Sequence, residues 1–303
     1  GADNPLREAL RRWTWAVAAG LWAVLLWSAR PASADEPSAL ALHFLDVGQG
    51  DAAVIRTPGG HWVLIDAGPR DERRDAGRAV VAPFLLRHGA RRLAVAVLSH
   101  AHLDHLGGLA AVLDRIPAAV VLEPGEMTAD PLYTSLLDRL GAKAIRWRAG
   151  RPGDQFALDG VRFSVLHPAP SWAEWGEDLN EDSLVLLVEY GSFQAIFAGD
   201  AGFPAESLMA PRLRPVDLLK VGHHGSRGSS SDLWLSRLRP RAAVISVGRG
   251  NRYGHPTPEA VARLTRAGTR VWRTDRDGTV TVTTDGRQMT VLTRDGRAEF
   301  DVN

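Results

Sequence analysis

The sequence contains no cysteine among its 303 residues. This absence excludes disulfide bonds and thiolate zinc sites, so any metal ion must be held by histidine, carboxylate or amide side chains. A strong net charge is also missing, since the formal value is +1 at pH 7, and this balance does not by itself indicate a nucleic-acid-binding protein. Lysine is scarce beside arginine, whose forked guanidinium suits phosphate groups.

Long hydrophobic runs are limited to one segment near the N-terminus. Arg7, Arg11 and Arg12 precede an uncharged run over residues 13–29, about 17 residues, which is the lower limit for a helix that spans a bilayer. The run predicts either a signal peptide, cleaved after the ASA at 32–34, or the last transmembrane helix of a larger membrane protein.

In both cases the arginines stay in the cytoplasm and the remainder is exported. We therefore expect a soluble domain on the extracytoplasmic side of a bacterial inner membrane or, after signal cleavage, a periplasmic or secreted protein. The chain divides into residues 1–39, a hydrophobic helix with its linker, and residues 40–303, one folded domain.

From residue 40 onward, short apolar segments alternate with amphipathic ones. The predicted strands are 41–47, 52–57, 61–68, 92–98, 161–166, 183–190, 193–200, 216–221 and 242–248, with a further strand and a hairpin over 270–293. The predicted helices are 75–88, 107–116, 232–240 and 257–268. Each half opens with meander-like strands and continues with strands and helices in alternation. This order predicts an α/β fold of two mixed sheets covered by helices, an αββα sandwich.

The stretch SHAHLDHLGG, residues 99–108, follows a continuous apolar strand. Its H-x-H motif directs His100 and His102 to the same side, because side chains alternate along an extended chain. Asp104 and His105 turn the other way and can serve a second ion. Other polar side chains that follow apolar strands are Asp200, His223, His224 and His255. Strand ends at one edge of a sandwich converge, so we expect a metal site there, with a carboxylate such as Asp200 bridging two ions.

These motifs resemble those of the metallo-β-lactamase superfamily, whose fold is an αββα sandwich. The H-x-H-x-D-H motif indicates the superfamily as a whole. More specifically, FLDVGQGDAAVIRTPGG, NEDSLVLLVEYG, LLKVGHHGSRGSS and NRYGHPTPE resemble the C-terminal hydrolase-like domain of the ComEC family of competence proteins. The resemblance runs in order from about residue 40 to 283, and a hydrophobic helix before FLDVGQGD is similar to the junction with the ComEC membrane region.

The resemblance implies one or two divalent metal ions, zinc or manganese. The implied ligands are His100 and His102 for the first ion, Asp104 and His105 for the second, Asp200 as the bridge, and either His223 or His224 to complete the second site. Many members of the superfamily place another first-site histidine where this chain has NEDSLVL, with Asn180 and Ser183. Because an amide is a weaker ligand than imidazole, manganese is here as suitable as zinc.

The resemblance also implies roles for residues around the metals. Asp66 holds the ligand loop by accepting backbone hydrogen bonds, and Asp104 orients the attacking hydroxide. His255 meets the substrate phosphate or leaving oxygen as a donor or general acid. Ser226 and its loop supply phosphate-binding amides, with Arg227 as a charged partner.

In function, the resemblance implies a metal-dependent phosphodiesterase that hydrolyses DNA in a DNA-uptake protein. The implied partners are DNA, the membrane, reached through the N-terminal helix or an upstream channel region, and other competence proteins. Arg227, Arg249 and Arg252 lie in loops of the site, where they either contact phosphates or form a solvated rim. An aromatic stacking platform is not evident, since Trp172 and Trp175 are expected to pack locally.

Two alternatives remain open at the level of sequence. In the first, the domain is a non-catalytic DNA-docking module of the translocation channel. The full set of ligands argues against this alternative, whereas Asn180 and the modest net charge keep it open. In the second, the domain is a free-standing exported metallo-hydrolase of another substrate, such as a phosphodiester of the envelope.

Overall fold

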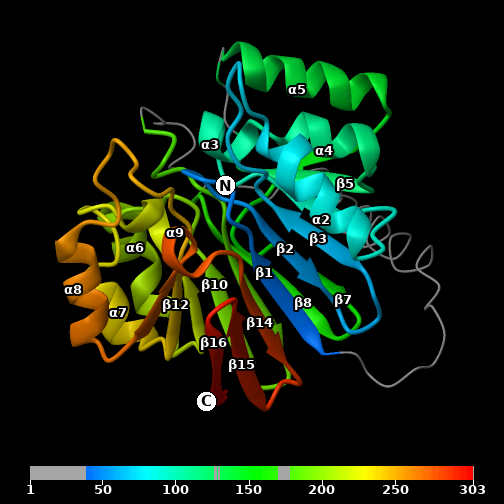
Figure 1. Cartoon of the computed structure of the whole chain (residues 1–303). Helices are drawn as coiled ribbons and strands as arrows, with labels where there is room; N and C mark the ends of the chain where they lie inside the picture. Colours follow the sequence, from blue (N-terminus) through cyan, green and yellow to red (C-terminus); the bar gives the residue numbers. More distant parts are fainter. Residues whose placement is uncertain (1–38, 126–127, 129, 170–177, 303) are drawn as a thin grey trace, which may run out of the picture. The chain divides into compact units, whose positions relative to one another are not determined.

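The computed structural model of the chain describes residues 39–125, 128, 130–169 and 178–302, which belong to one unit over Ser38–Asn303. Figure 1 shows two β-sheets in this unit, with helices on both outer sides. The predicted αββα sandwich is therefore confirmed. The hydrophobic run at 13–29 lies outside the described residues, and among those described no helix is long and apolar enough to cross a membrane. The predicted boundary near residue 39 stays a prediction.

Within the described residues, the first sheet contains nine strands in the order β16-β15-β14-β1-β2-β3-β4-β5-β6. Their bounds are β1 Leu40–Phe44, β2 Ala53–Arg56, β3 Trp62–Ile65, β4 Val95–Val97, β5 Val120–Glu123, β6 Arg146–Ala149, β14 Val280–Thr284, β15 Gln288–Thr293 and β16 Gly296–Asp301. The strands from β16 through β1 to β3 pair antiparallel, whereas those from β3 to β6 pair parallel.

The second sheet contains seven strands in the part of the chain that the structure describes, in the order β13-β12-β11-β10-β9-β8-β7. Their bounds are β7 Gln155–Leu158, β8 Val161–His167, β9 Val185–Tyr190, β10 Phe193–Phe197, β11 Leu218–Lys220, β12 Ala242–Ile245 and β13 Arg270–Arg273. Pairing is antiparallel from β7 to β10 and parallel from β10 to β13. Both sheets thus change from antiparallel to parallel pairing, as the rhythm of the sequence predicts.

Helices cover the outer face of each sheet (Figure 1). On the first sheet these are η1 Gly77–Val81, α2 Ala82–Arg87, α4 Leu109–Arg115 and α5 Pro131–Ala142, and on the second α6 Phe203–Met209, α7 Asp232–Leu238 and α8 Pro258–Arg266. Separate buried clusters join the helices to their sheets, around Leu85 and Leu109 on one side and around Trp234 and Leu264 on the other. Between the sheets, Phe44 of β1 stacks on Phe197 of β10 with ring centroids 5.6 Å apart.

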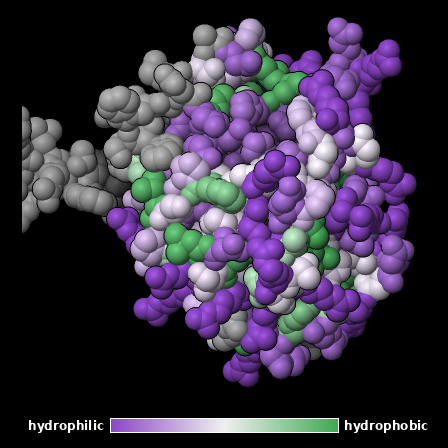
Figure 2. Space-filling model, turned by 90° about the vertical axis from the view of Figure 1, so that its left-hand side faces the viewer, coloured by the Kyte–Doolittle hydropathy of each residue, from purple (hydrophilic) through white to green (hydrophobic). Residues whose placement is uncertain are grey.

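Strands such as β3 and β12 are buried at every residue, because helices on one side and the facing sheet on the other exclude water from both of their faces. Figure 2 shows, by contrast, that the face over α7 and α8 is mainly hydrophilic, with small separate hydrophobic patches. The sequence analysis did not identify strands β5, β6, β7 and β16 or helices α5 and α6. Strand β16 has only one buried residue, Ala298, so it carries almost none of the apolar pattern by which strands are recognised.

Candidate metal centre

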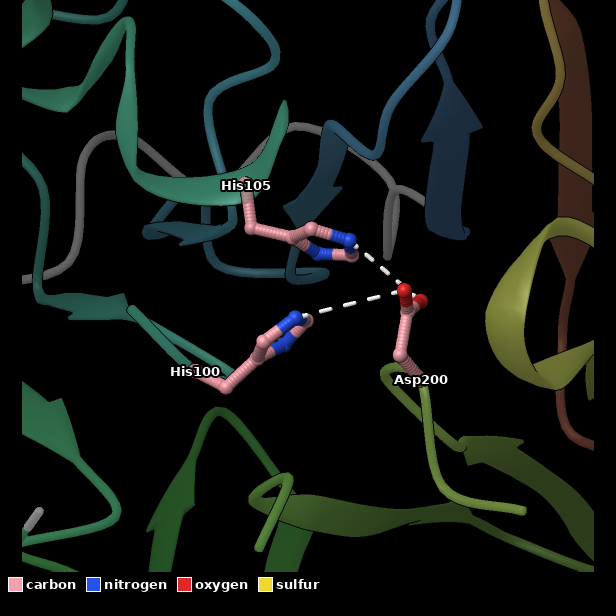
Figure 3. Close-up of side chains that lie close together, drawn as sticks. All are labelled: His100, His105 and Asp200. Carbon is pink, nitrogen blue, oxygen red and sulfur yellow. Dashed lines mark ion pairs between the residues drawn. The ribbon is translucent and has the colours of Figure 1, made fainter. Parts of the chain in front are cut away.

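Polar side chains from the ends of strands in both sheets meet at one edge of the sandwich. His100 follows β4, His105 belongs to the short helix α3 (Leu103–Leu106), and Asp200 follows β10 of the other sheet. Figure 3 shows the two imidazoles and the carboxylate pointing toward one another. The Oδ1 atom of Asp200 lies 3.3 Å from Nε2 of His105, and its Oδ2 lies 3.9 Å from Nε2 of His100. All three residues are buried.

His102 and Asn180 lie beside His100 and complete a first group of ligand atoms. Nδ1 of His102 is 3.0 Å from Nε2 of His100 and 3.0 Å from Oδ1 of Asn180. The asparagine that stands in place of a histidine therefore points its carbonyl oxygen at the same position. Ser183 supports this group from below, since its hydroxyl accepts the backbone N–H of Asp200 at 2.9 Å and lies 3.4 Å from Nδ1 of His100.

A second group forms around His224. Its Nε2 atom is 3.1 Å from Oδ2 of Asp104 and 3.5 Å from Oδ2 of Asp200, while its Nδ1 donates to the backbone carbonyl of Ser246 at 2.9 Å. Because that hydrogen bond occupies Nδ1, Nε2 is the atom available to a metal. His105 lies in the same group, because one of its ring nitrogens is within 4.8 Å of a ligand atom of Asp104 and of His224.

The histidine pair of the HHGS motif separates into two positions. His224 is buried within the centre, whereas the side chain of His223 is 34% exposed, with Nε2 3.9 Å from Oδ2 of Asp200. Both residues have positive φ, 48° and 52°, in the left-handed region that costs a non-glycine residue about 1–3 kcal/mol. This turn directs the neighbouring side chains apart, and its geometry favours His224 over His223 as the ligand of the second ion.

Asp66 orients the ligand loop. One carboxylate oxygen accepts the backbone N–H of Ser99 at 2.7 Å, and the other lies 2.7 Å from the Ser99 hydroxyl and 2.8 Å from Nδ1 of His105. Holding Nδ1 of His105 turns its Nε2 toward Asp200, an arrangement typical of metal-binding histidines. The metal, catalytic and supporting roles of all these residues stay predictions.

Asp51, the last residue of the GQGD stretch, is a site residue that the sequence analysis missed. It is buried with Lys220 of β11, and the Lys220 ammonium pairs with its carboxylate and donates to the Gly199 carbonyl at 3.2 Å. The other carboxylate oxygen of Asp51 is 3.3 Å from Nδ1 of His224. The signal in the sequence was a charged residue after a glycine-rich turn, with a lone lysine inside an apolar strand.

Gly50 explains why this turn needs glycine. Its φ is 142°, and an added Cβ would lie 2.3 Å from the carbonyl oxygen of Asp104, which also accepts the backbone N–H of Asp51 at 3.1 Å. The GQGD turn and the histidine loop are therefore in direct backbone contact, so the turn positions Asp51 beneath the ligands.

The electrostatics of the centre follow from this crowding. Burial alone would lower the pKa of both His105 and His224, but the surrounding carboxylates, Asp200 foremost, raise the pKa of His105 well above its ordinary value and that of His224 to about 10. Burial likewise opposes ionisation of Asp200, yet His105 and His224 hold its pKa well below the usual range. His100 differs, because burial, assisted by His105, lowers its pKa. The centre is thus a buried set of carboxylates that attracts positive charge.

The residues fit a divalent metal ion. Nε2 of His105 and Oδ1 of Asp200 are buried and have no hydrogen-bond partner among the described residues. The possible ligand atoms of His100, His105 and Asp200 all lie within 4.8 Å of one another, as do those of Asp104, His105 and His224. Imidazole nitrogens and carboxylate oxygens are ligands for zinc, manganese and iron, so the donor set alone does not select the metal.

At the rim of the centre, the ring of His255 lies 5.6 Å from that of His223. Burial, with His223 nearby, lowers the pKa of His255.

In the predicted phosphate-binding loop after the HHGS motif, some of the polar groups are bound to other residues of the protein. Ser226 is buried, and the amides of Ser230 and Ser231 donate to the buried carboxylate of Glu206 at 2.5 and 2.7 Å. Those two amides are therefore not free for a substrate phosphate. The exposed Arg227 side chain forms an ion pair with Glu259 at 2.9 Å, its only ion pair among the described residues.

Comparisons with known proteins agree with this geometry. Residues 45–249 match the family model of the metallo-beta-lactamase superfamily. The chain is 32% identical over 252 residues to ComE operon protein 3 of Bacillus subtilis, covering 78% of this chain and 32% of that protein. It is 32% identical over 264 residues to competence protein ComA of Neisseria gonorrhoeae, covering 85% of this chain and 34% of that protein.

The chain thus spans about a third of the length of these relatives, and the resemblance to ComEC-type competence proteins is confirmed. Among solved structures, the metallo-beta-lactamase fold protein YhfI of Bacillus subtilis superposes with a TM-score of 0.54 at 13% identity, covering 81% of this chain and 100% of that one. That likeness concerns the fold alone. With the fold, the converging histidines and aspartates and the matching family model in place, this chain belongs to the metallo-β-lactamase superfamily.

Proposed function

We propose that the domain is a metal-dependent phosphodiesterase that cleaves DNA in the context of DNA uptake. The observation that carries the proposal is the buried convergence of His100, His105, His224 and Asp200. Within it, Nε2 of His105 and Oδ1 of Asp200 have no hydrogen-bond partner in the part of the chain that the structure describes. The relatives, among them a protein named for competence, supply the DNA context. A bound divalent ion supplies a nucleophilic hydroxide at neutral pH and a Lewis acid for a phosphoryl oxygen.

Asp104 is suited to orient the nucleophile. Its side chain is only partly buried, so it reaches both the ligands and the opening of the site. Burial would raise its pKa, but His105 and His224 hold the pKa well below its ordinary value. Asp104 is therefore ionised at neutral pH and can accept a hydrogen bond from an attacking water or hydroxide.

His255 is suited to donate a hydrogen bond to the substrate. Its lowered pKa keeps the imidazole neutral at pH 7, and a neutral imidazole offers one N–H donor. Its Nδ1 atom is buried without a hydrogen-bond partner among the described residues. At neutral pH we thus expect His255 to stabilise a phosphate or leaving oxygen as a donor.

The test is cleavage of labelled single- and double-stranded DNA by the full chain in manganese, in zinc or in chelator. Asp104→Ala should abolish cleavage, whereas Asp301→Ala, on the exposed edge strand β16, should leave it unchanged. Metal-dependent cleavage that the first variant lacks would support the proposal. If the wild type binds metal and DNA but cleaves neither form, the proposal is wrong and the domain is a docking module of the translocation channel. If it binds metal but not DNA, a hydrolase of another phosphodiester takes its place.

The location of the domain is part of the same proposal. We place it on the extracytoplasmic side of a bacterial inner membrane because of the arginines and the apolar run at 7–29. The N-terminal sequence of the protein isolated from cells tests this: cleavage after residue 34 would indicate an exported, free-standing protein instead.

A further inference from the structure

Residues 246–257 form the loop between β12 and α8 (Figure 1). This loop carries an exposed aromatic side chain near the candidate metal centre. Tyr253 is 54% exposed, the highest value among the large hydrophobic side chains of the described residues. Its ring stacks on His255 at an interplanar angle of 20° with centroids 6.0 Å apart. The guanidinium of Arg252 lies 5.0 Å from the centroid of the same ring and donates to its hydroxyl at 2.9 Å.

This loop is held in shape without a ligand. The Asn251 side chain accepts the backbone N–H of Tyr253 and of His255, each at 3.1 Å, and donates to the carbonyls of Gly248 and His255. The N–H of Gly248 in turn donates to the side chain of Gln49. A flat ring on a preformed loop binds a partner at a lower entropic cost than a mobile one.

A row of aromatic rings connects Tyr253 to the candidate metal centre. Nε2 of His223 is 3.9 Å from Asp200, the His255 ring is 5.6 Å from the His223 ring, and Tyr253 stacks on the outer side of His255. The rings of His223 and His255 thus lie one after the other between Asp200 and Tyr253, which puts the tyrosine next to the substrate path of the proposed centre.

The charge around the ring favours an anionic partner. Arg249 donates to the backbone carbonyl of Asp275, and Arg252 donates to Tyr253. Neither arginine makes an ion pair with a carboxylate in the described part of the chain. A ligand that offers both flat apolar groups and regularly spaced negative charges matches this surface, and single-stranded DNA has both.

We propose that Tyr253 and Arg252 form a stacking platform for a nucleobase next to the phosphodiester held at the metal centre. This inference rests on the proposed function and names a substrate-binding element for it. A base stacks on the exposed side of the Tyr253 ring, and the exposed Arg252 guanidinium either moves aside or covers the base as a third layer. Because every base has a π-face, the platform selects for unpaired bases and not for sequence. Trp172 and Trp175 lie outside the described residues.

The experiment compares two fluorescent ligands of equal length and charge, an oligothymidylate and the same backbone with abasic sites, by anisotropy with the full chain loaded with manganese. Both strands carry phosphorothioate linkages so that they resist hydrolysis during the titration. The wild type should bind the oligothymidylate about tenfold more tightly than the abasic strand. Tyr253→Ala should remove this preference while leaving the affinity for the abasic strand unchanged, and Tyr253→Phe should retain it. Trp147→Ala is the matched control, because Trp147 is an aromatic residue of similar exposure, 46%, on the edge strand β6.

Equal affinities of the wild type for the two ligands, or an unchanged preference in Tyr253→Ala, would overturn the inference. If the wild type still cleaves DNA in either case, the proposed function stands and only the platform is wrong. If the wild type neither binds nor cleaves DNA, the proposed function fails and the platform falls with it.

Discussion

The buried metal centre and its exposed rim differ in what determines the charge of their side chains. Inside, His105 and Asp200 are fully surrounded by protein, and their charges are set by one another. At the rim, Arg227 and Arg252 are exposed, and water screens whatever they contact. Charge buried between two sheets is strongly coupled to stability, whereas exposed charge is available for a substrate at little structural cost.

Asp200→Asn should have the largest effect, because it removes a buried charge that faces four histidines. We expect metal binding to weaken and cleavage to fall at least about 1,000-fold, equivalent to about 4 kcal/mol. The bound metal is measured by mass spectrometry after dialysis, beside the rate, with Asp301→Asn as the control. A variant that keeps its metal and its rate would show that Asp200 is not a ligand.

Lys220→Met tests how strongly the interior depends on paired charge. The substitution leaves the buried Asp51 carboxylate without its ammonium partner, which should lower the free energy of unfolding by about 3–5 kcal/mol. The control is Lys143→Met, since Lys143 forms an exposed pair with Asp114 at 3.1 Å, and its loss should cost under about 1 kcal/mol. Urea unfolding in chelator measures both. Similar losses in the two variants would remove the distinction between buried and exposed ion pairs.

Glu206 accepts the backbone amides of Ser230 and Ser231, in the loop that follows the HHGS motif, and makes this loop sensitive to pH. Burial raises its pKa to about 7, although hydrogen bonds from Ser231 and Ser230 oppose the shift. A carboxyl with a raised pKa in the fold stabilises the protein fully below its unfolded pKa of about 4.5, and this contribution is lost as the pH rises through about 7. The wild type should therefore lose up to about 3 kcal/mol of stability between pH 4.5 and 8 relative to Glu206→Gln. Parallel stability curves for the two proteins would contradict this.

Arg227→Ala should have the smallest effect on the fold. Its exposed pair with Glu259 contributes at most about 1 kcal/mol to stability. If the rim contacts DNA phosphates, the variant should bind all sequences more weakly and its salt dependence should fall by about one unit of slope. Titrations at several salt concentrations measure this slope. Binding with an unchanged slope would place Arg227 on a solvated surface outside the substrate path.

Much of the fold was determined by the sequence itself. The apolar runs and the repeated rhythm of strands and helices predict the αββα sandwich, because they are local patterns with a local physical cause. The H-x-H-x-D-H motif after β4 indicates the superfamily by resemblance. The separate strand-end positions of Asp200 and the HHGS pair also predict a shared site, since strand ends of a sandwich meet at one edge.

Three features of the site could be known only from the tertiary structure. They are the different positions of His223 and His224, the buried pair of Asp51 and Lys220, and the hydrogen bonds from the amides of Ser230 and Ser231 to Glu206. The solvent exposure of Tyr253 near the centre is a fourth. These features depend on contacts between residues as many as 169 positions apart and on backbone angles in a four-residue turn. A residue's type does not report its depth or its partners, and in a buried site those two quantities determine its charge and what it can bind.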